Sequence, residues 1–320
     1  MVSKYAVDQC DCLDGLSKLE DCSIHQLLTD PPYGLSLLGN SWDKVLPSQR
    51  VWDECYRVLR PGAFALVFGD TRLYHRVACS LEDAGFSIKD CLVWVYATGF
   101  PHGFDIGKAI AKKTGDTDAA SIWAGWSTQL KPSWEAIVVA QKPLIGSYVD
   151  NVLKWNVGGI NIDACRIPWE SEEDMLSIES FRHFTEGDYG DPRYFSANTN
   201  GKKQVNANPL GRWPANLVYF DSLFPGTYDK FFMVPKPQGT GYEHDTEKPL
   251  DLMLRLVKMF TPDPLVVKED VIVLDCYAGS GTTGAACQVL RRAFVGFDSD
   301  PKAVSEATRR LKAKKERCCL

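Results

Sequence analysis

Residues 271–284 read VIVLDCYAGSGTTG, and this stretch decides the fold. Its first half is an apolar run typical of a buried strand, and it leads into a glycine turn and the expected start of a helix. Gly279, Gly281 and Gly284 fit the GxGxxG pattern, in which glycines let the backbone approach a bound nucleotide closely. The next apolar run ends at Asp298, which is placed to accept hydrogen bonds from ribose hydroxyls. The stretch therefore predicts a strand–loop–helix unit that binds a nucleotide-like cofactor.

The glycine pattern alone leaves the cofactor open. NAD or FAD would fit it, so an NAD-dependent oxidoreductase is an alternative function. However, Asp275 ends the strand ahead of the glycines. A carboxylate at that position favours a ligand with an ammonium or sulfonium group over a pyrophosphate.

The rest of the chain alternates between short apolar runs and helical patterns. Besides Val271–Asp275, strands are expected at Lys4–Asp8, His25–Thr29, Ala63–Gly69, Cys91–Val95, Ala136–Ala140 and Ala293–Phe297. Helices are expected at Ser48–Leu59, Arg72–Ala84, Asp105–Lys113, Glu247–Phe260, Thr282–Arg291 and Pro301–Lys315. This alternation predicts a Rossmann-like α/β fold, with a seven-stranded, mostly parallel sheet and helices on both faces.

The middle of the chain breaks the alternation, and we interpret residues 146–234 as an irregular insertion between residues 1–145 and 235–320. Its segment Pro192–Phe220 contains basic and aromatic residues and no acidic residue. Phosphates are bound by Arg and Lys, so the candidate DNA-binding residues are Arg193, Lys202, Lys203 and Arg212.

Composition narrows the class of protein. The 320 residues carry a formal net charge of -5, so a nucleic-acid partner would have to meet a local basic surface. The chain has no apolar run long enough for a membrane span and no signal peptide, so we expect a cytoplasmic protein. The eleven cysteines include no CxxC spacing, which makes a metal site an unfavoured interpretation.

A second motif, Asp30-Pro31-Pro32-Tyr33, directly follows the apolar run His25–Thr29. Two consecutive prolines fix the backbone and remove two N–H donors, which leaves a rigid site rich in acceptors. Such a site suits the exocyclic amino group of a nucleobase, with the Tyr33 ring placed to stack on the base. Taken alone, the tetrapeptide also fits a simple turn with a helix-capping aspartate.

Together the two motifs resemble the DNA amino-methyltransferases that use S-adenosylmethionine, in the permuted β group. In that group the DPPY segment precedes the glycine loop, and here Asp30 precedes Asp275. Residues 11–13, 57–62, 135–143 and 246–250 resemble further segments of the family. The resemblance implies that residues 1–145 and 235–320 are the catalytic and cofactor-binding halves of one core. The composition of residues 146–234 makes them the candidate for target recognition, with a solvated loop as the alternative.

The resemblance also implies the roles of individual residues. The catalytic residues would be Asp30, Pro31, Pro32 and Tyr33. The cofactor would be bound by Asp11, Cys12, Asp30, Thr246, Lys248, Asp275, Tyr277, Ala278, Gly279, Ser280, Gly281, Thr282 and Asp298. The implied substrate is double-stranded DNA, with the target base flipped out, in a restriction–modification setting. A homodimer is a further expectation, because members of the group are often dimers.

The target base is the finer question. Cytosine carbon-5 methylation needs a cysteine nucleophile, usually after proline, and the chain has no Pro-Cys pair. In the family, Asp at the first position of the tetrapeptide is associated with adenine N6 and Ser with cytosine N4. We therefore favour adenine N6, with cytosine N4 as the alternative. A catalytically silent DNA-binding module is a third class.

Overall fold

The sheet that the apolar runs predict is present in the computed structural model, which describes residues 4–35, 43–96, 103–175, 208–219, 232–233 and 247–317. In these residues the strands form one nine-stranded sheet with the order β1-β9-β8-β2-β3-β5-β4-β6-β7. The strands are β1 (Tyr5–Gln9), β2 (Ile24–Thr29), β3 (Leu59–Gly69), β4 (Ser87–Val95), β5 (Trp134–Gln141), β6 (Leu217–Tyr219), β7 (Phe232–Met233), β8 (Ile272–Asp275) and β9 (Ala293–Asp298).

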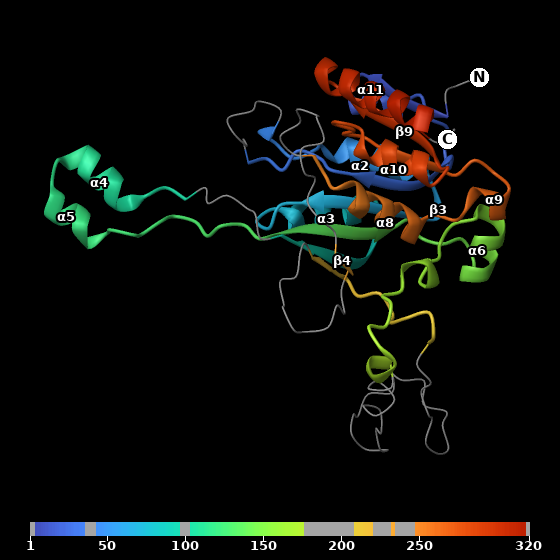
Figure 1. The fold of residues 1–320 in the computed structure, drawn as a ribbon. Helices are drawn as coiled ribbons and strands as arrows, with labels where there is room; N and C mark the ends of the chain where they lie inside the picture. Colours follow the sequence, from blue (N-terminus) through green and yellow to red (C-terminus); the bar gives the residue numbers. More distant parts are fainter. Residues whose placement is uncertain are drawn as a thin grey trace.

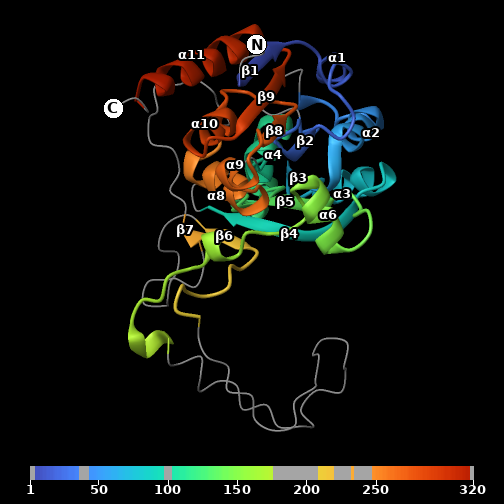
Figure 2. The same ribbon diagram turned by 90° about the vertical axis from the view of Figure 1, so that its right-hand side faces the viewer.

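The mostly parallel α/β sheet is confirmed. All neighbouring strands are parallel except for the two pairs that β5 makes with β3 and β4. The seven predicted strands are all present, but seven was too low a count. The additional strands β6 and β7 lie at the edge opposite β1 (Figure 2). They have three and two residues, which is too short to give a periodic signal in the sequence.

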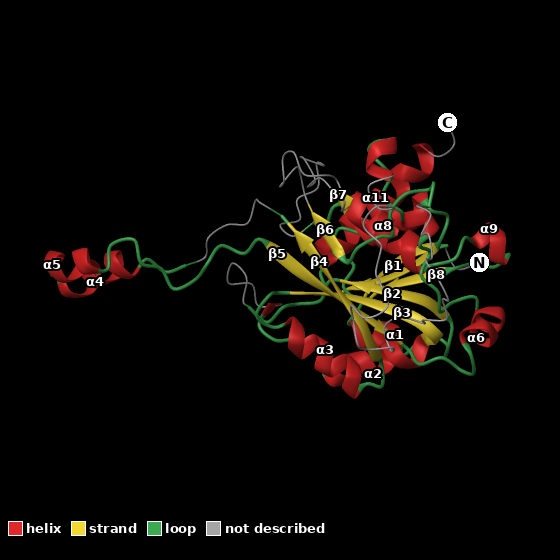
Figure 3. Cartoon of the chain, turned by 90° about the horizontal axis from the view of Figure 1, so that it is seen from below, coloured by secondary structure: helices red, strands yellow, loops and turns green. Residues whose placement is uncertain are grey.

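Helices cover both faces of the sheet because successive residues of its central strands point to opposite sides. On β2, Leu28 belongs to an apolar cluster with residues of α8 (Leu250–Phe260) and α10 (Thr282–Val289). Its neighbour Leu27 belongs to a cluster with residues of α2 (Gln49–Val58). Figure 3 shows these two layers on opposite sides of the strands. A strand buried on both faces reads as a continuous apolar run, which is why the sequence revealed it.

All six predicted helices are present, and shorter ones accompany them. Beside α2 and under the same face lie α1 (Cys12–Leu16) and α3 (Tyr74–Asp83), while α11 (Pro301–Arg317) joins α8 and α10 on the other face. The remaining elements are α4 (Ile106–Thr114), α5 (Thr117–Ile122), α6 (Tyr148–Trp155), α9 (Pro264–Val267) and the 3-10 turn η3 (Asp163–Cys165).

The pair α4 and α5, between β4 and β5, lies well away from the sheet (Figure 1). The Asp105 side chain caps α4 by accepting a hydrogen bond from the Lys108 N–H, and an isolated β-bridge between Asp105 and Ser127 joins the chain before α4 to the chain after α5. After α5, the rings of Trp123 and Trp126 meet edge to face with centroids 5.1 Å apart, and both remain exposed. The pair is therefore an arm whose apolar side chains are not covered by the sheet.

Two parts of the segment interpreted as an insertion lie against the sheet. Asn151 on α6 is fully buried and donates hydrogen bonds to the carbonyls of Pro61 (2.9 Å) and Val157 (3.0 Å). Later in the segment, β6 pairs in parallel with the end of β4. The division at residues 145 and 234 stays a prediction, and these contacts show where that segment meets the core.

Among the helices of the described ranges, none combines the length and the apolarity that a membrane crossing needs. In the same residues, no group of three or more His, Cys, Asp or Glu side chains is arranged to hold a metal ion.

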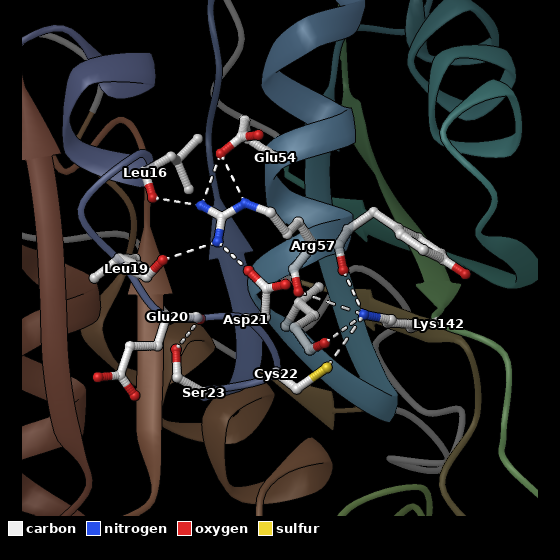
Figure 4. A network of polar contacts seen from close by, with 11 residues as sticks. Leu16, Leu19, Glu20, Asp21, Cys22, Ser23, Glu54, Arg57 and Lys142 are labelled. Atoms are coloured by element: carbon white, nitrogen blue, oxygen red, sulfur yellow. Dashed lines mark hydrogen bonds and ion pairs between the residues drawn. The ribbon is translucent and has the colours of Figure 1, made fainter.

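The end of α2 is the centre of a polar network (Figure 4). The Arg57 guanidinium donates to the carbonyls of Leu16 and Leu19, both at 2.9 Å, and forms an ion pair with Asp21 at 2.6 Å. These contacts fix the connection between α1 and β2 against α2. Since β2 leads directly into Asp30, the network sets the path of the chain toward the second motif.

Lys142, which directly follows β5, binds the same helix end. Its Nζ lies 2.7 Å from the Tyr56 carbonyl oxygen, 2.8 Å from that of Leu59 and 3.8 Å from the Cys22 Sγ. The carbonyls at a helix C-terminus lack partners within the helix and carry partial negative charge. The buried ammonium therefore satisfies acceptors that no other part of the helix can reach.

Substituting Lys142→Met should destabilise the protein, because it leaves those buried carbonyls without a donor. We expect the free energy of unfolding to fall by about 3 kcal/mol. The matched control is Lys154→Met, at an exposed lysine on α6, for which we expect a change below about 0.5 kcal/mol. Urea unfolding of both variants measures this, and equal losses would contradict the role given to Lys142.

Candidate active site

Four acidic residues meet at one edge of the sheet. Asp30 follows β2, Asp275 ends β8, Asp298 ends β9 and Asp11 follows β1. These four strands are neighbours in the order β1-β9-β8-β2, and all of them are parallel. In an open α/β sheet, ligands bind outside the carboxyl ends of the strands. The two sequence motifs, far apart along the chain, therefore lie together at the carboxyl ends of neighbouring strands.

Asp275 joins the two motifs through hydrogen bonds. Its carboxylate, in a residue that is 4 % exposed, accepts from the hydroxyls of Thr29 at 2.7 Å and Thr283 at 2.6 Å, and from the Tyr277 N–H at 3.2 Å. Burial raises the pKa of Asp275 to about 6, although the Thr283 and Thr29 hydrogen bonds act in the opposite direction. The residue thus binds β2, β8 and the start of α10 to one another. Its predicted contact with the cofactor stays a prediction.

The glycine loop is anchored to Asp298. The Gly279 N–H donates to one carboxylate oxygen of Asp298 at 2.9 Å, and the Asp300 N–H donates to the other at 2.9 Å. Gly281 has φ +77°, and a Cβ on it would lie 2.8 Å from the Ala307 Cβ. Only glycine fits this position without strain, and it lets α10 begin beside α11. Each Asp298 oxygen keeps a lone pair for a further donor such as a hydroxyl.

The residues expected on the cofactor's adenine side lie next to this loop. Asp11 caps α1 by accepting from the Leu13 N–H at 2.8 Å. The Cys12 thiol is 3.5 Å from the Tyr277 hydroxyl, and burial raises the pKa of both groups. The structure therefore brings Asp11, Cys12 and Tyr277 to the loop that Asp298 holds.

The Asp30–Tyr33 segment is a rigid turn held from two sides. The Tyr33 hydroxyl donates to Asp30 Oδ1 at 2.6 Å. Asp43 Oδ1 accepts from the N–H groups of Tyr33 at 2.6 Å and Gly34 at 3.0 Å. The two prolines have no N–H, so these are the first backbone donors after Asp30. Asp43 is 3 % exposed, and the sequence analysis did not single it out, because its link to the motif depends on how the chain folds back.

Two further charged groups stand beside Asp30. The Lys248 Nζ lies 2.7 Å from Asp30 Oδ2 and 3.0 Å from Glu135 Oε2. Burial raises the pKa of Asp30, the Lys248 charge opposes that shift and the Glu135 charge adds to it. The two carboxylates raise the pKa of Lys248 against the lowering effect of its burial. Lys248, expected near the cofactor, thus lies directly on the Asp30 carboxylate.

Glu135 was missed as a site residue because the sequence did not predict the direction of β5. It lies at the start of β5, which runs antiparallel to β3. The start of an antiparallel strand meets the carboxyl ends of its parallel neighbours. An acidic residue directly before the buried run Ala136–Ala140 was the available signal.

Arg310 on α11 ties the chain before α8 to the glycine loop. Its guanidinium forms an ion pair with Glu247 and donates to the hydroxyls of Ser280, at 3.2 Å, and Thr282. The residue is only 5 % exposed. Because Glu247 directly precedes Lys248, this ion pair helps to fix the backbone position of Lys248.

The predicted DNA contacts are only partly described. Three of them, Arg193, Lys202 and Lys203, lie outside the described residues, as does Thr246, which was predicted at the cofactor. Arg212 is 9 % exposed and forms an ion pair with Asp174, and its guanidinium lies 4.6 Å from the centre of the Trp169 ring. Its contact with DNA stays a prediction, and in this structure its charge is already matched by Asp174.

Comparison with known proteins supplies the class of the site. Residues 24–309 match the N6/N4 methyltransferase family model, described as DNA methylase. The chain is 27 % identical over 352 residues to the type II methyltransferase M.HindIII of Haemophilus influenzae, covering 96 % of this chain and 95 % of the relative. It is 23 % identical to the type II methyltransferase M1.MboII of Moraxella bovis, with 96 % of each chain covered.

Solved structures share the fold. The complex of M1.HpyAVI with SAM superposes with a TM-score of 0.51 at 18 % identity, covering 96 % of this chain and 98 % of the other. The cytosine-N4-specific PvuII DNA methyltransferase gives a TM-score of 0.53 at 13 % identity, covering 96 % and 86 %.

Substituting Asp275→Asn should remove a pH dependence of folding. The pKa of Asp275 is about 6 in the folded state against an ordinary value of 3.8, so between these values the folded carboxyl keeps a proton that the unfolded one has lost. The wild-type free energy of unfolding should therefore fall, by about 3 kcal/mol relative to the variant, as the pH rises through that interval. Urea unfolding across the interval measures this. A difference between the two proteins that stays constant with pH would contradict the buried carboxyl.

Proposed function

The chain belongs to the N6/N4 methyltransferase family and is a DNA methyltransferase, and we propose that it methylates the N6 amino group of adenine in double-stranded DNA. The observation that carries the proposal is the position of Asp30. Its carboxylate follows β2, and the glycine loop follows β8, the strand that pairs with β2. A group that binds an amine and a loop that binds a cofactor are thereby adjacent.

The cofactor is S-adenosylmethionine, which supplies a methyl group made electrophilic by the adjoining sulfonium. The described residues fit it: Gly279 and Gly281, with φ of +49° and +77°, form the tight turn after β8, and Asp298 retains acceptor capacity for ribose hydroxyls. We assign the adenine side to Asp11 and Cys12. The methionine side is assigned to Asp275, Tyr277, Ala278, Gly279, Ser280, Gly281 and Thr282, with Thr246 flanking the pocket.

The chain's own residues then prepare the amine. An exocyclic amino group is a weak nucleophile because its lone pair is delocalised into the base. Acceptance of its two N–H bonds by the Asp30 carboxylate and the Pro31 carbonyl would localise that lone pair, and Tyr33 would stack on the base. Attack by the nitrogen would form the nitrogen–carbon bond as the carbon–sulfur bond breaks, with S-adenosylhomocysteine as the leaving group, and the nitrogen would then lose its extra proton to water. Asp30 stabilises the positive charge that develops on the nitrogen.

The base must leave the duplex to reach Asp30, because a stacked and paired amino group is inaccessible to the turn. We assign target recognition to residues 146–234, with Arg193, Lys202, Lys203 and Arg212 as candidate DNA contacts. The type II relatives support a place in a restriction–modification system. A homodimer stays a prediction.

The choice of adenine over cytosine N4 depends on Asp30. The fold is shared with the cytosine-N4-specific PvuII enzyme, so the architecture favours neither base. Resemblance to the adenine-specific pattern, with Asp at the first position of the tetrapeptide, supports N6. Cytosine N4 is the alternative product.

Nucleoside analysis of DNA methylated by the purified protein should give N6-methyladenine, because Asp at the first position of the tetrapeptide resembles the adenine-specific pattern. Sequencing of the modified DNA would also map the target site. Asp30→Ala should lower the rate by about 10²–10³-fold with cofactor and DNA saturating, because it removes a charged acceptor from the transition state.

The matched control is Asp83→Ala, at an exposed aspartate at the end of α3, which should leave the rate unchanged. N4-methylcytosine as the sole product would refute the choice of base. Full activity of Asp30→Ala would refute the assigned site.

A further inference from the structure

The Lys248 ammonium stands where an amine is expected in the proposed reaction. It donates to Asp30 Oδ2 at 2.7 Å, and charge-assisted N–H···O hydrogen bonds have this length. A flipped base would bring its amino nitrogen to the same carboxylate at a similar distance. Asp30 Oδ1 already accepts from the Tyr33 hydroxyl at 2.6 Å. The base therefore competes with Lys248 for the open side of the carboxylate.

A second acceptor is ready for the ammonium. The Lys248 Nζ is 3.0 Å from Glu135 Oε2 and 3.4 Å from the Tyr33 hydroxyl, and its side chain is 10 % exposed. The lysine side chain is flexible and its three donors rotate freely, so a small movement can exchange one carboxylate for the other. Leaving Asp30 for Glu135 keeps the charge paired, which avoids the large cost of an unpaired buried ion.

The charges explain why the lysine is present. Asp30 and Glu135 are both carboxylates on the wall of one site, and Lys248 is the cation that touches both of them. Without it, two largely buried negative charges would face each other, and one of the carboxylates would take up a proton. A protonated Asp30 would be a poorer acceptor for an amine.

We propose that Lys248 and Glu135 form a gate at the Asp30 carboxylate: in the free protein the Lys248 ammonium takes the place of the target amino group, and the incoming base displaces it onto Glu135. This inference rests on the proposed function. It makes Lys248 and Glu135 positioning residues that act through Asp30, and it moves Lys248 from the cofactor to the side of the target base.

Other titratable groups face the gate. Tyr33 touches both carboxylates, and Tyr96, just after β4, has its pKa raised by burial and by Glu135. The charge of Asp70, after β3, contributes to raising the pKa of Tyr96, and the charge of Asp30 contributes to raising the pKa of Asp275 on β8. Each of these residues is retained in the variants below, so a difference in pH profile between the variants reports on Lys248 and Glu135.

The test compares Lys248→Gln and Glu135→Gln in methyl transfer to a duplex carrying the mapped target site, across a range of pH. Loss of the Lys248 charge should raise the pKa of Asp30 and move the acid limb of the rate profile upward by about one pH unit. Loss of the Glu135 charge should lower that pKa and move the acid limb downward. Lys248→Arg should restore the wild-type profile.

Duplex binding gives a second readout that needs no turnover. Glu135→Gln removes the place to which the ammonium retreats, so the Kd for the duplex, measured with S-adenosylhomocysteine present, should rise about tenfold. Lys248→Gln removes the competitor, so its Kd should not rise. Both variants should bind the cofactor as the wild type does. The matched controls are Lys258→Gln and Glu82→Gln, at exposed positions on α8 and α3.

Shifts of the acid limb in the same direction, or no shift, would overturn the gate and leave the proposed function standing. Loss of cofactor binding in Lys248→Gln would also overturn it, because the lysine would then belong to the cofactor. A wild-type protein that methylates no DNA base would overturn the proposed function, and the gate with it.

Discussion

Thr29 on β2 donates a 2.7 Å hydrogen bond to the carboxylate of Asp275 on β8, and the two residues are 246 positions apart in the chain. The same carboxylate accepts from Thr283 at the start of α10. This buried interaction fixes the turn after β2 against the glycine loop after β8. The proposed methyl transfer requires the distance between this turn and the glycine loop to be short and constant, because a reaction between two bound molecules depends on their alignment.

Charge is the second constraint on the site. Its edge of the sheet gathers Asp30, Asp275, Asp298 and Glu135, which is costly unless donors or cations compensate. Asp275 and Asp298 are compensated by hydroxyl and backbone donors, whereas Asp30 and Glu135 share one lysine. Asp30 also accepts from the Tyr33 hydroxyl. The Lys248 ammonium is carried on a flexible stem, and it lies at the carboxylate that is proposed to receive the target amine.

The sequence predicted elements well and their pairing poorly. Strands buried on both faces read as apolar runs, so the seven longer strands were found. Glycine and proline turns marked both motifs, and the roles given to Asp30 and Gly279–Gly281 stay predictions. Periodicity carries no strand direction, which hid the antiparallel β5 and with it Glu135. Lys248 was expected at the cofactor from the resemblance of residues 246–250 to a family segment. In the structure its long side chain reaches Asp30 from the chain before α8. Asp43 and Arg310 act through tertiary contacts alone, for which the sequence holds no local signal.

If the glycine loop binds S-adenosylmethionine beside Asp30, a titration of the wild-type protein with labelled S-adenosylmethionine should show it. We expect saturable binding of one molecule per chain, displaced by S-adenosylhomocysteine and unaffected by NAD. Displacement by NAD, or no saturable binding, would contradict it, because the GxGxxG loop would then serve a different ligand.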